Sequence, residues 1–175
     1  MDASLKLSIK SILDEIRTEA PGNWANPNST FYGIRILSID KRGSFGERVF
    51  VHLLSNALPA VRRLIYNDGD QGDWDVSVNG IRFEIKTSSI DVNNKFQNEG
   101  LKADGDYEAV FFLGITPERL YFKLTKKEDI PFSNLHNRGE RGTGRGHKWD
   151  FKISDMVELV DIDTFAQEFT SIFLE

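Results

Sequence analysis

The chain of 175 residues contains no cysteine, which excludes disulfide bonds and zinc sites built from thiolates. No apolar run is long enough to cross a bilayer, and the first residues lack the basic-then-apolar order of a secretion signal. Basic residues are outnumbered 22 to 27 by acidic ones, and the net charge of −5 argues against a general nucleic-acid coat protein. We therefore expect a cytoplasmic protein.

The charges are nevertheless segregated along the chain. Residues 67–75 hold four acidic residues and no basic one, whereas residues 134–152 hold five basic residues and two acidic ones. An acidic centre beside a basic segment suits a metal site that meets a polyanion, so nucleic acid stays a candidate partner. The length fits one domain with a sizeable core, and no repeat or linker divides residues 1–175.

The most informative segment covers residues 73–86, DWDVSVNGIRFEIK. Asn79-Gly80 is a preferred dipeptide of the type I′ turn, so the segment predicts a β-hairpin with this pair as its loop. Because side chains alternate along each strand, one face of the hairpin collects the apolar residues and the other collects the polar ones. The apolar face is Trp74, Val76, Val78, Ile81, Phe83 and Ile85, and the polar face is Asp73, Asp75, Ser77, Arg82, Glu84 and Lys86.

The predicted register sets Asp75 opposite Glu84, with Lys86 on the same face. Two carboxylates roughly 5 Å apart repel by about 3 kcal/mol at an effective dielectric near 20. A divalent cation between them would reverse that sign, and Mg²⁺ is commonly bound by one or two protein carboxylates. The hairpin thus predicts a Mg²⁺ site with a lysine beside it. The alternative is a solvated outer face of an amphipathic hairpin. Asp73 is a rival ligand, but the register favours Asp75, which faces Glu84, whereas Asp73 faces Lys86 and could form a plain salt bridge with it.

A helix is predicted over residues 44–58, where apolar side chains recur at helical spacing. Ser44 and Glu47 have the spacing of a capping box, in which the glutamate bonds to the backbone at the start of the helix. Glu47 also precedes Phe50 by three residues and Leu54 by seven, so it points along the buried stripe. Glu47 is therefore either a capping residue or an active-site acid.

The remaining segments predict a mixed α/β chain. Strands are expected at residues 61–66, 107–116 and 119–125 and within 149–160, and helices at residues 4–20 and 161–175. Residues 94–102 have a weakly helical pattern, and residues 133–148 form a loop rich in Gly, Arg and His.

A strand that ends in an acid, followed by a hairpin strand with the pattern Glu-x-Lys, resembles the PD-(D/E)xK nuclease superfamily. The matching residues are Asp75 and Glu84-Ile85-Lys86, with Glu47 on a preceding helix. Trp74 stands where the name of the superfamily has proline, which is why Asp73 remains a rival to Asp75.

The resemblance extends beyond the hairpin. Residues 94–99 and 106–117 look like the helix and strand that follow the active site in some type II restriction endonucleases, so it covers about residues 44–130. It implies a restriction-endonuclease-like core, with a central mixed β-sheet flanked by helices. It also implies Mg²⁺-dependent hydrolysis of phosphodiester bonds in double-stranded DNA, by a sequence-specific type II restriction enzyme that acts as a homodimer.

The resemblance also assigns roles to the matching residues. Asp75, Glu84 and the backbone carbonyl of Ile85 would bind Mg²⁺. Lys86 would assist the attacking water, and Glu47 would complete the site.

The loop at residues 133–148 is the candidate DNA contact, because arginine is the usual side chain that reads guanine and glycine permits close approach. The alternative is a flexible, solvated loop. The candidate DNA-binding residues are Arg138, Arg141, Arg145, Gln97 and His147.

Two other functions stay open at this point. The first is a repair or recombination nuclease of the same superfamily, acting on branched, mismatched or nicked DNA. The second is a non-catalytic DNA-binding or protein-interaction domain, whose acidic face is only solvated.

Overall fold

The computed structural model describes residues 22–58, 64–66, 72–137 and 146–174. Six strands form a central sheet in the order β1-β2-β3-β5-β6-β9. All neighbours in it are antiparallel except β3 and β5, which are parallel. The predicted central mixed sheet is therefore confirmed. Its strands are β1 (Leu64–Tyr66), β2 (Val76–Val78), β3 (Ile81–Ser89), β5 (Ala109–Ile115), β6 (Leu120–Lys126) and β9 (Val157–Glu158).

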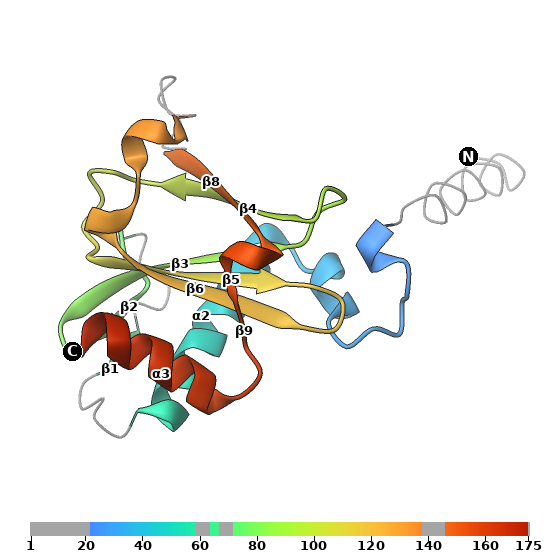
Figure 1. Ribbon diagram of the computed structural model, residues 1–175, viewed down its shortest axis with the longest axis horizontal. Coiled ribbons are helices and arrows are strands. Elements are labelled where there is room, and N and C mark those ends of the chain that lie inside the picture. The colour runs from blue at the N-terminus through green and yellow to red at the C-terminus, as the bar shows by residue number, and fades with distance from the viewer. Residues whose placement is uncertain (1–21, 59–63, 67–71, 138–145, 175) are drawn as a thin grey trace, which may run out of the picture.

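A second, three-stranded antiparallel sheet covers one face of the central sheet (Figure 1). It consists of β4 (Lys95–Leu101), β8 (His147–Lys152) and β7 (His136–Asn137), with β8 in the middle. The two sheets meet through aromatic rings: Phe112 of β5 lies 5.6 Å from Trp149 and 4.9 Å from Phe151, between ring centroids. We refer to β4, β8 and β7 below as the small sheet.

Two helices cover the opposite face of the central sheet (Figure 1). These are α2 (Ile39–Ala57) and α3 (Ile162–Phe173). The ring centroid of Phe50 in α2 lies 4.6 Å from that of Phe111 and 5.1 Å from that of Phe83, and Phe165 in α3 packs on the same cluster. Because helices lie on one face and the small sheet on the other, every residue of β5 is buried.

Five short 3₁₀ helices connect these elements within the described residues. They are η1 (Gly22–Trp24), η2 (Tyr32–Ile36), η3 (Lys127–Asp129), η4 (Phe132–Asn134) and η5 (Ile153–Asp155).

The predicted hairpin is confirmed as β2 and β3. Val78 pairs with Ile81 and Val76 with Phe83. The loop residues Asn79 and Gly80 have φ of 50° and 97°, as a type I′ turn requires. The apolar face packs into the core, where Val76 and Phe83 are fully buried.

The predicted start of the first described helix was wrong. Helix α2 begins at Ile39, and the Ser38 side chain caps it by accepting a hydrogen bond from the Lys41 amide. Ser44 and Glu47 therefore lie inside the helix, and the capping-box interpretation of Glu47 is excluded.

The weakly helical interpretation of residues 94–102 was also wrong, because Lys95–Leu101 form strand β4. Side chains alternate along it, with Phe96, Asn98 and Leu101 buried and Lys95 and Gln97 exposed. This period of two is diagnostic of a half-buried strand.

The strands expected at residues 107–116 and 119–125 are confirmed as β5 and β6, the strand-like segments expected within 149–160 as β8 and β9, and the helix expected at 161–175 as α3. The loop expected at residues 133–148 was partly wrong, because β7 lies in it and β8 already begins at His147. Of the strand expected at 61–66, Leu64–Tyr66 are described and form β1. The helix expected at residues 4–20 lies outside the described residues. Within the described residues, no helix has the length and apolarity that crossing a membrane requires.

Candidate active site

The pairing of β2 with β3 covers Val76 to Val78. Asp75 directly precedes this paired segment. The Asp75 amide donates to the Phe83 carbonyl at 2.8 Å, and its Oδ2 accepts from the Ile85 amide at 2.7 Å. The carboxylate thus caps a backbone N–H of β3 that lies beyond the paired part of β2. Because the N–H and C=O of one strand residue face the same neighbour, the Ile85 carbonyl is directed to this edge too.

This geometry modifies the predicted register. Paired residues of β2 and β3 end at Val76 and Phe83, so Asp75 bonds to the backbone beside Glu84 instead of pairing with it across a ladder. The two carboxylates remain close enough that the charge of Glu84 raises the pKa of Asp75. Asp75 and Glu84 are therefore close to each other as predicted, but through the hydrogen bond of Asp75 to the Ile85 amide and not through cross-strand pairing.

Glu84 and Lys86 form an ion pair on the face of β3 that the small sheet partly covers. Their side chains retain only 16% and 19% of their exposure. They are two residues apart on one strand, so they point the same way. At Glu84 and Lys86 the polar face of the hairpin is therefore largely buried instead of solvated, whereas Arg82 and Asp73 on the same face stay 32% and 36% exposed.

The pKa of the Asp75 carboxyl is raised from its ordinary value of 3.8 to about 7. The main cause is burial, which disfavours the charged form, and the negative charges of Glu84 and Glu47 add to it. The Ile85 amide and the Lys86 charge act in the opposite direction without cancelling the rise. Burial and the neighbouring acids therefore dominate at Asp75.

Glu47 comes near this site because α2 lies very close to β3. A Cβ atom added to Gly46 would lie 1.8 Å from Thr87 Oγ1, so only glycine permits the observed approach. Thr87 directly follows Lys86, and Glu47 directly follows Gly46. The close contact therefore delivers the Glu47 charge to the neighbourhood of Asp75.

The residues present fit a Mg²⁺ ion that keeps most of its shell for water and phosphate. Within the described segments, no three His, Asp or Glu side chains gather as ligands of one ion, so Glu47 is not a third direct ligand. Asp75, Glu84 and the Ile85 carbonyl offer two carboxylates and a backbone oxygen, a protein share that Mg²⁺ accepts. Burial is the main cause of the raised pKa of Asp75, and the part that Glu84 and Glu47 add is the part that a cation would relieve.

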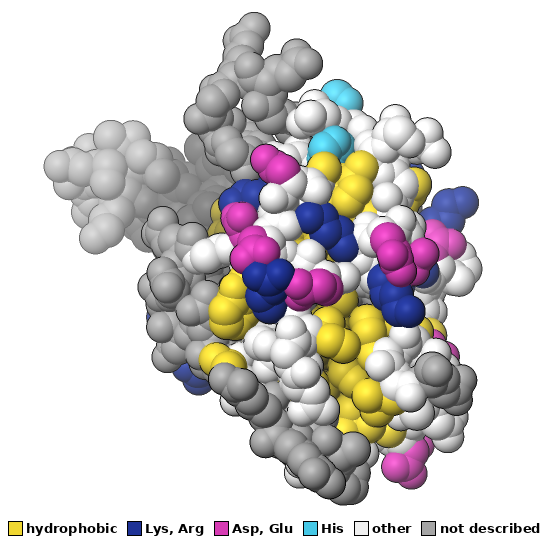
Figure 2. Space-filling model, turned by 90° about the vertical axis from the view of Figure 1, so that its left-hand side faces the viewer, with side chains coloured by type: hydrophobic (Ala, Val, Ile, Leu, Met, Phe, Trp, Pro, Cys, Tyr) yellow, Lys and Arg dark blue, Asp and Glu magenta, His cyan; other side chains and the backbone are white. Residues whose placement is uncertain are grey.

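Asp73 lies outside this cluster. Its carboxylate accepts from Lys102 Nζ at 2.7 Å and from the Asp106 amide at 3.3 Å, and these bonds lower its pKa. The expected alternative, a salt bridge between Asp73 and Lys86, is wrong. Acidic and basic side chains are interleaved on the neighbouring surface (Figure 2), as in the ion pairs of Arg82 with Glu108 and Asp106.

A polar cavity of about 560 Å³ is lined by Asp73, Lys102, Ala103, Asp104, Asn137, Gly146 and His147, and by none of Asp75, Glu84 and Lys86. The pKa of Lys102 is raised chiefly by its bond to Asp73, and the Glu84 charge contributes. Burial raises the pKa of Tyr107, and the Glu84 charge is the next cause. Lys102 and Tyr107 were not predicted as site residues, because β4 was taken for a helix and its end could not be placed.

The predicted DNA-binding residues are only partly brought together. His147 lines the cavity, and its Nδ1 lies 3.3 Å from the Leu101 carbonyl. Gln97 lies on the outer face of the small sheet, where it bonds to Asp91 and Lys148. Arg138, Arg141 and Arg145 lie outside the described residues.

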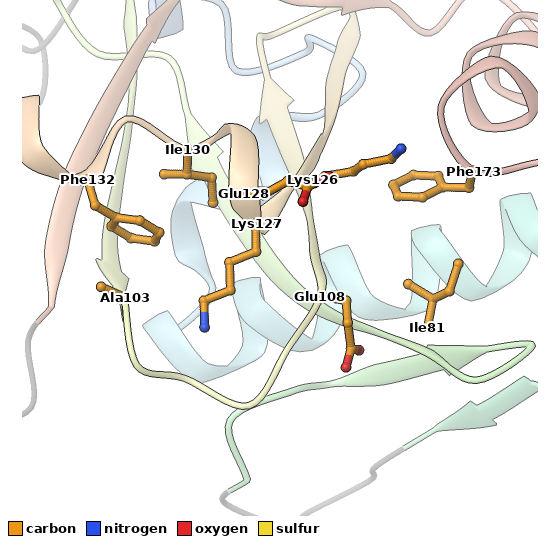
Figure 3. A pocket seen from close by; sticks show the side chains of 9 residues that line it. All are labelled: Ile81, Ala103, Glu108, Lys126, Lys127, Glu128, Ile130, Phe132 and Phe173. Carbon is orange, nitrogen blue, oxygen red and sulfur yellow. The ribbon is translucent and has the colours of Figure 1, made fainter.

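A larger cavity, of about 690 Å³, shares Ala103 with the polar cavity (Figure 3). Its lining is mostly apolar, with Ile81 and Phe173 at one end and Ala103 and Phe132 at the other. Glu108 also lines it, but its carboxylate is bound by Arg82. Glu128 is a second acid of this lining. We place the candidate chemistry at Asp75 and Glu84 because the charge of Glu84 raises the pKa of Asp75, although neither residue lines either cavity.

Comparisons with protein-family models, curated proteins and solved structures gave no match. Function is therefore inferred from the geometry of the site.

Proposed function

We propose that this chain is a Mg²⁺-dependent endonuclease that hydrolyses phosphodiester bonds of double-stranded DNA. In this proposal it has a restriction-endonuclease-like core and acts as a homodimeric, sequence-specific type II restriction enzyme. The supporting observation is the cluster where β2 stops pairing with β3. There Asp75 accepts a hydrogen bond from the Ile85 amide, its pKa is raised by burial and by the charge of Glu84, and Glu84 forms an ion pair with Lys86.

Asp75, Glu84 and the Ile85 carbonyl would hold the ion. A bound Mg²⁺ would stabilise the charge that develops on the phosphate and favour ionisation of the attacking water. The electrostatics of the cluster support this role, because the neighbouring acids and burial together raise the pKa of Asp75.

Lys86 is the group that orients the nucleophile. Its ammonium donates hydrogen bonds, so it holds a water with an oxygen lone pair aimed at phosphorus. Its position two residues after Glu84 on a central strand fixes it against the ion-binding carboxylate. Glu47, on α2, accepts hydrogen bonds from the water around the site.

The polar cavity is the proposed approach for the DNA backbone. Lys102 and His147 supply donors to phosphate along it. Contacts of the arginines at residues 138, 141 and 145 with base edges would add sequence preference, and a homodimer would present two sites to the two strands of a symmetric target.

Plasmid cleavage tests this proposal directly. The wild-type chain should nick or linearise supercoiled plasmid with Mg²⁺ and not with EDTA. Glu84→Ala and Lys86→Ala should abolish cleavage, whereas Glu108→Ala should not, since that acid lies outside the cluster. Unchanged cleavage by either site variant would refute the assignment. Comparison of intact, nicked and branched duplexes separates restriction from repair.

One observation favours a second candidate, a non-catalytic DNA-binding or protein-interaction domain. Lys86 and Glu84 already neutralise each other, as a purely structural ion pair would. That candidate predicts no Mg²⁺-dependent rise in melting temperature and no loss of function in Asp75→Ala.

A further inference from the structure

Asn98 on β4 has a buried side-chain oxygen that no described group satisfies. The residue is 3% exposed. Its Nδ2 donates to the carbonyls of Phe96 at 3.4 Å and Trp149 at 3.3 Å, whereas its Oδ1 has no hydrogen-bond partner among the described residues. Buried polar atoms of folded proteins nearly always have a hydrogen-bond partner. The Asn98 oxygen is therefore available to a donor group that reaches it in another side-chain conformation.

Strand β4 carries Asn98 across the face of the central sheet on which Lys86 lies. The Phe96 ring packs against Gly114 of β5, two residues beyond Phe112, which pairs with Lys86 in the parallel ladder. Asn98 follows Phe96 by two residues, so both side chains point toward the central sheet, and both are buried.

The residue that pairs with Asn98 in the small sheet helps to locate Asn98 relative to Lys86. Asn98 pairs with Trp149 of β8, whose ring lies 5.6 Å from that of Phe112. Strand β4 packs on β3 more extensively than on β5. Asn98 is therefore displaced from Phe112 toward β3, which is where Lys86 lies.

We propose that Asn98 is a positioning residue for Lys86, an inference that rests on the nuclease function proposed above. Glu84 holds the Lys86 ammonium in the structure described. When Glu84 turns its carboxylate to a bound Mg²⁺, Lys86 loses that partner. The Asn98 oxygen then accepts one N–H of the ammonium and leaves the other two for the water and the phosphate.

The contact is tested first without DNA or metal, by NMR of the chain labelled with ¹⁵N-lysine. The Lys86 ammonium signal is assigned by its loss in Lys86→Arg. In Glu84→Leu, which removes the acceptor at position 84, the signal should persist, because Asn98 takes over the ammonium and slows its exchange with water. In Glu84→Leu combined with Asn98→Leu it should be lost. Persistence in the double variant, or loss in Glu84→Leu alone, overturns the proposal.

The role in cleavage is tested by a double-mutant cycle. Asn98→Leu should lower kcat and leave KM for DNA unchanged, whereas Asn98→Asp, which keeps an oxygen at this position, should restore cleavage. Adding Asn98→Leu to Lys86→Ala should cause no further loss, because the asparagine acts through the lysine. Independent losses in the two variants would show a merely structural role and overturn the proposal.

Thr125→Val is the matched control. Thr125 also has a buried, unpartnered oxygen in the described structure, and it pairs with Val110 on the same face of the central sheet. Its removal should change neither the ammonium signal nor kcat. If Asn98→Leu does not fold, Asn98→Ala is used, since alanine has no side-chain oxygen. If the variants give the expected ammonium signals but the wild-type chain never cleaves DNA, the nuclease function is refuted, whereas the contact between Asn98 and Lys86 is supported.

Discussion

Asp75→Asn is expected to stabilise the fold at about pH 8 and to leave its stability unchanged near pH 4. The folded protein retains the Asp75 proton up to a pKa of about 7, whereas the unfolded chain releases it at the ordinary value of 3.8. The folded state therefore binds more protons in this interval, so the free energy of unfolding falls as the pH rises through it. Asparagine has no proton to lose and can still accept from the Ile85 amide.

The size of the effect follows from the same interval. Each pH unit between the two pKa values is worth about 1.4 kcal/mol, which gives an upper limit of roughly 4 kcal/mol at pH 8. Asp75 is only half-buried, so solvent reduces the observed gain below that limit. The assay is urea unfolding in EDTA followed by tryptophan fluorescence across the pH range.

Asp73→Asn is the control two residues away. Its pKa is lowered by Lys102 and the Asp106 amide, so its charged form stabilises the fold above the ordinary pKa and this stabilisation is lost as the pH falls. Asp73→Asn should accordingly destabilise at pH 8, opposite in sign to Asp75→Asn. An Asp75→Asn chain that unfolds at the same or a lower urea concentration than wild type at pH 8 would refute the electrostatic account of the site.

Three further outcomes are expected. Gly46→Ala should destabilise the fold by about 1–3 kcal/mol, because its Cβ would overpack against Thr87. Gly43→Ala, whose Cβ would meet only ordinary contact, should stabilise the fold by up to about 1 kcal/mol. The urea midpoints of the two variants are compared, and equal midpoints would contradict the close approach of Gly46 to Thr87. Mg²⁺ at about 100 times its Kd should raise the free energy of unfolding by about 2.7 kcal/mol, and most of this rise should disappear in Glu84→Gln, as calorimetry would show. Gly80→Ala should cost more than about 1 kcal/mol, because φ is 97° although no atom obstructs the new Cβ; an unchanged melting temperature would exclude this turn strain.

The hairpin was predictable because all its determinants are local. The Asn79-Gly80 dipeptide sets the turn, and the alternation on either side sets the register. Strand β4 was missed because its stability comes from pairing with β8, about fifty residues later in the chain. Lysine, asparagine and glycine are poor strand formers, so tertiary pairing overrides the local preference there.

The candidate site shows the same division. Asp75 was preferred to Asp73 from the register alone, and the structure places Asp75 beside Glu84 and Asp73 on Lys102. The bond between Asp75 and the Ile85 amide could not be foreseen, since it depends on where β2 stops pairing. Glu47 could be named as a candidate, but its approach depends on the contact of Gly46 with β3.

In the sequence, β4 lies between β3 and β5, although these two strands are direct neighbours in the central sheet. This order has a consequence for how the chain folds during translation. Strand β3 and its carboxylate emerge from the ribosome early, but the small sheet requires β8, which is completed only at Lys152. During translation, the wall that covers Glu84 and Lys86 is therefore assembled after most of the central sheet. A nascent chain that ends before β8 would therefore carry Glu84 and Lys86 without this cover.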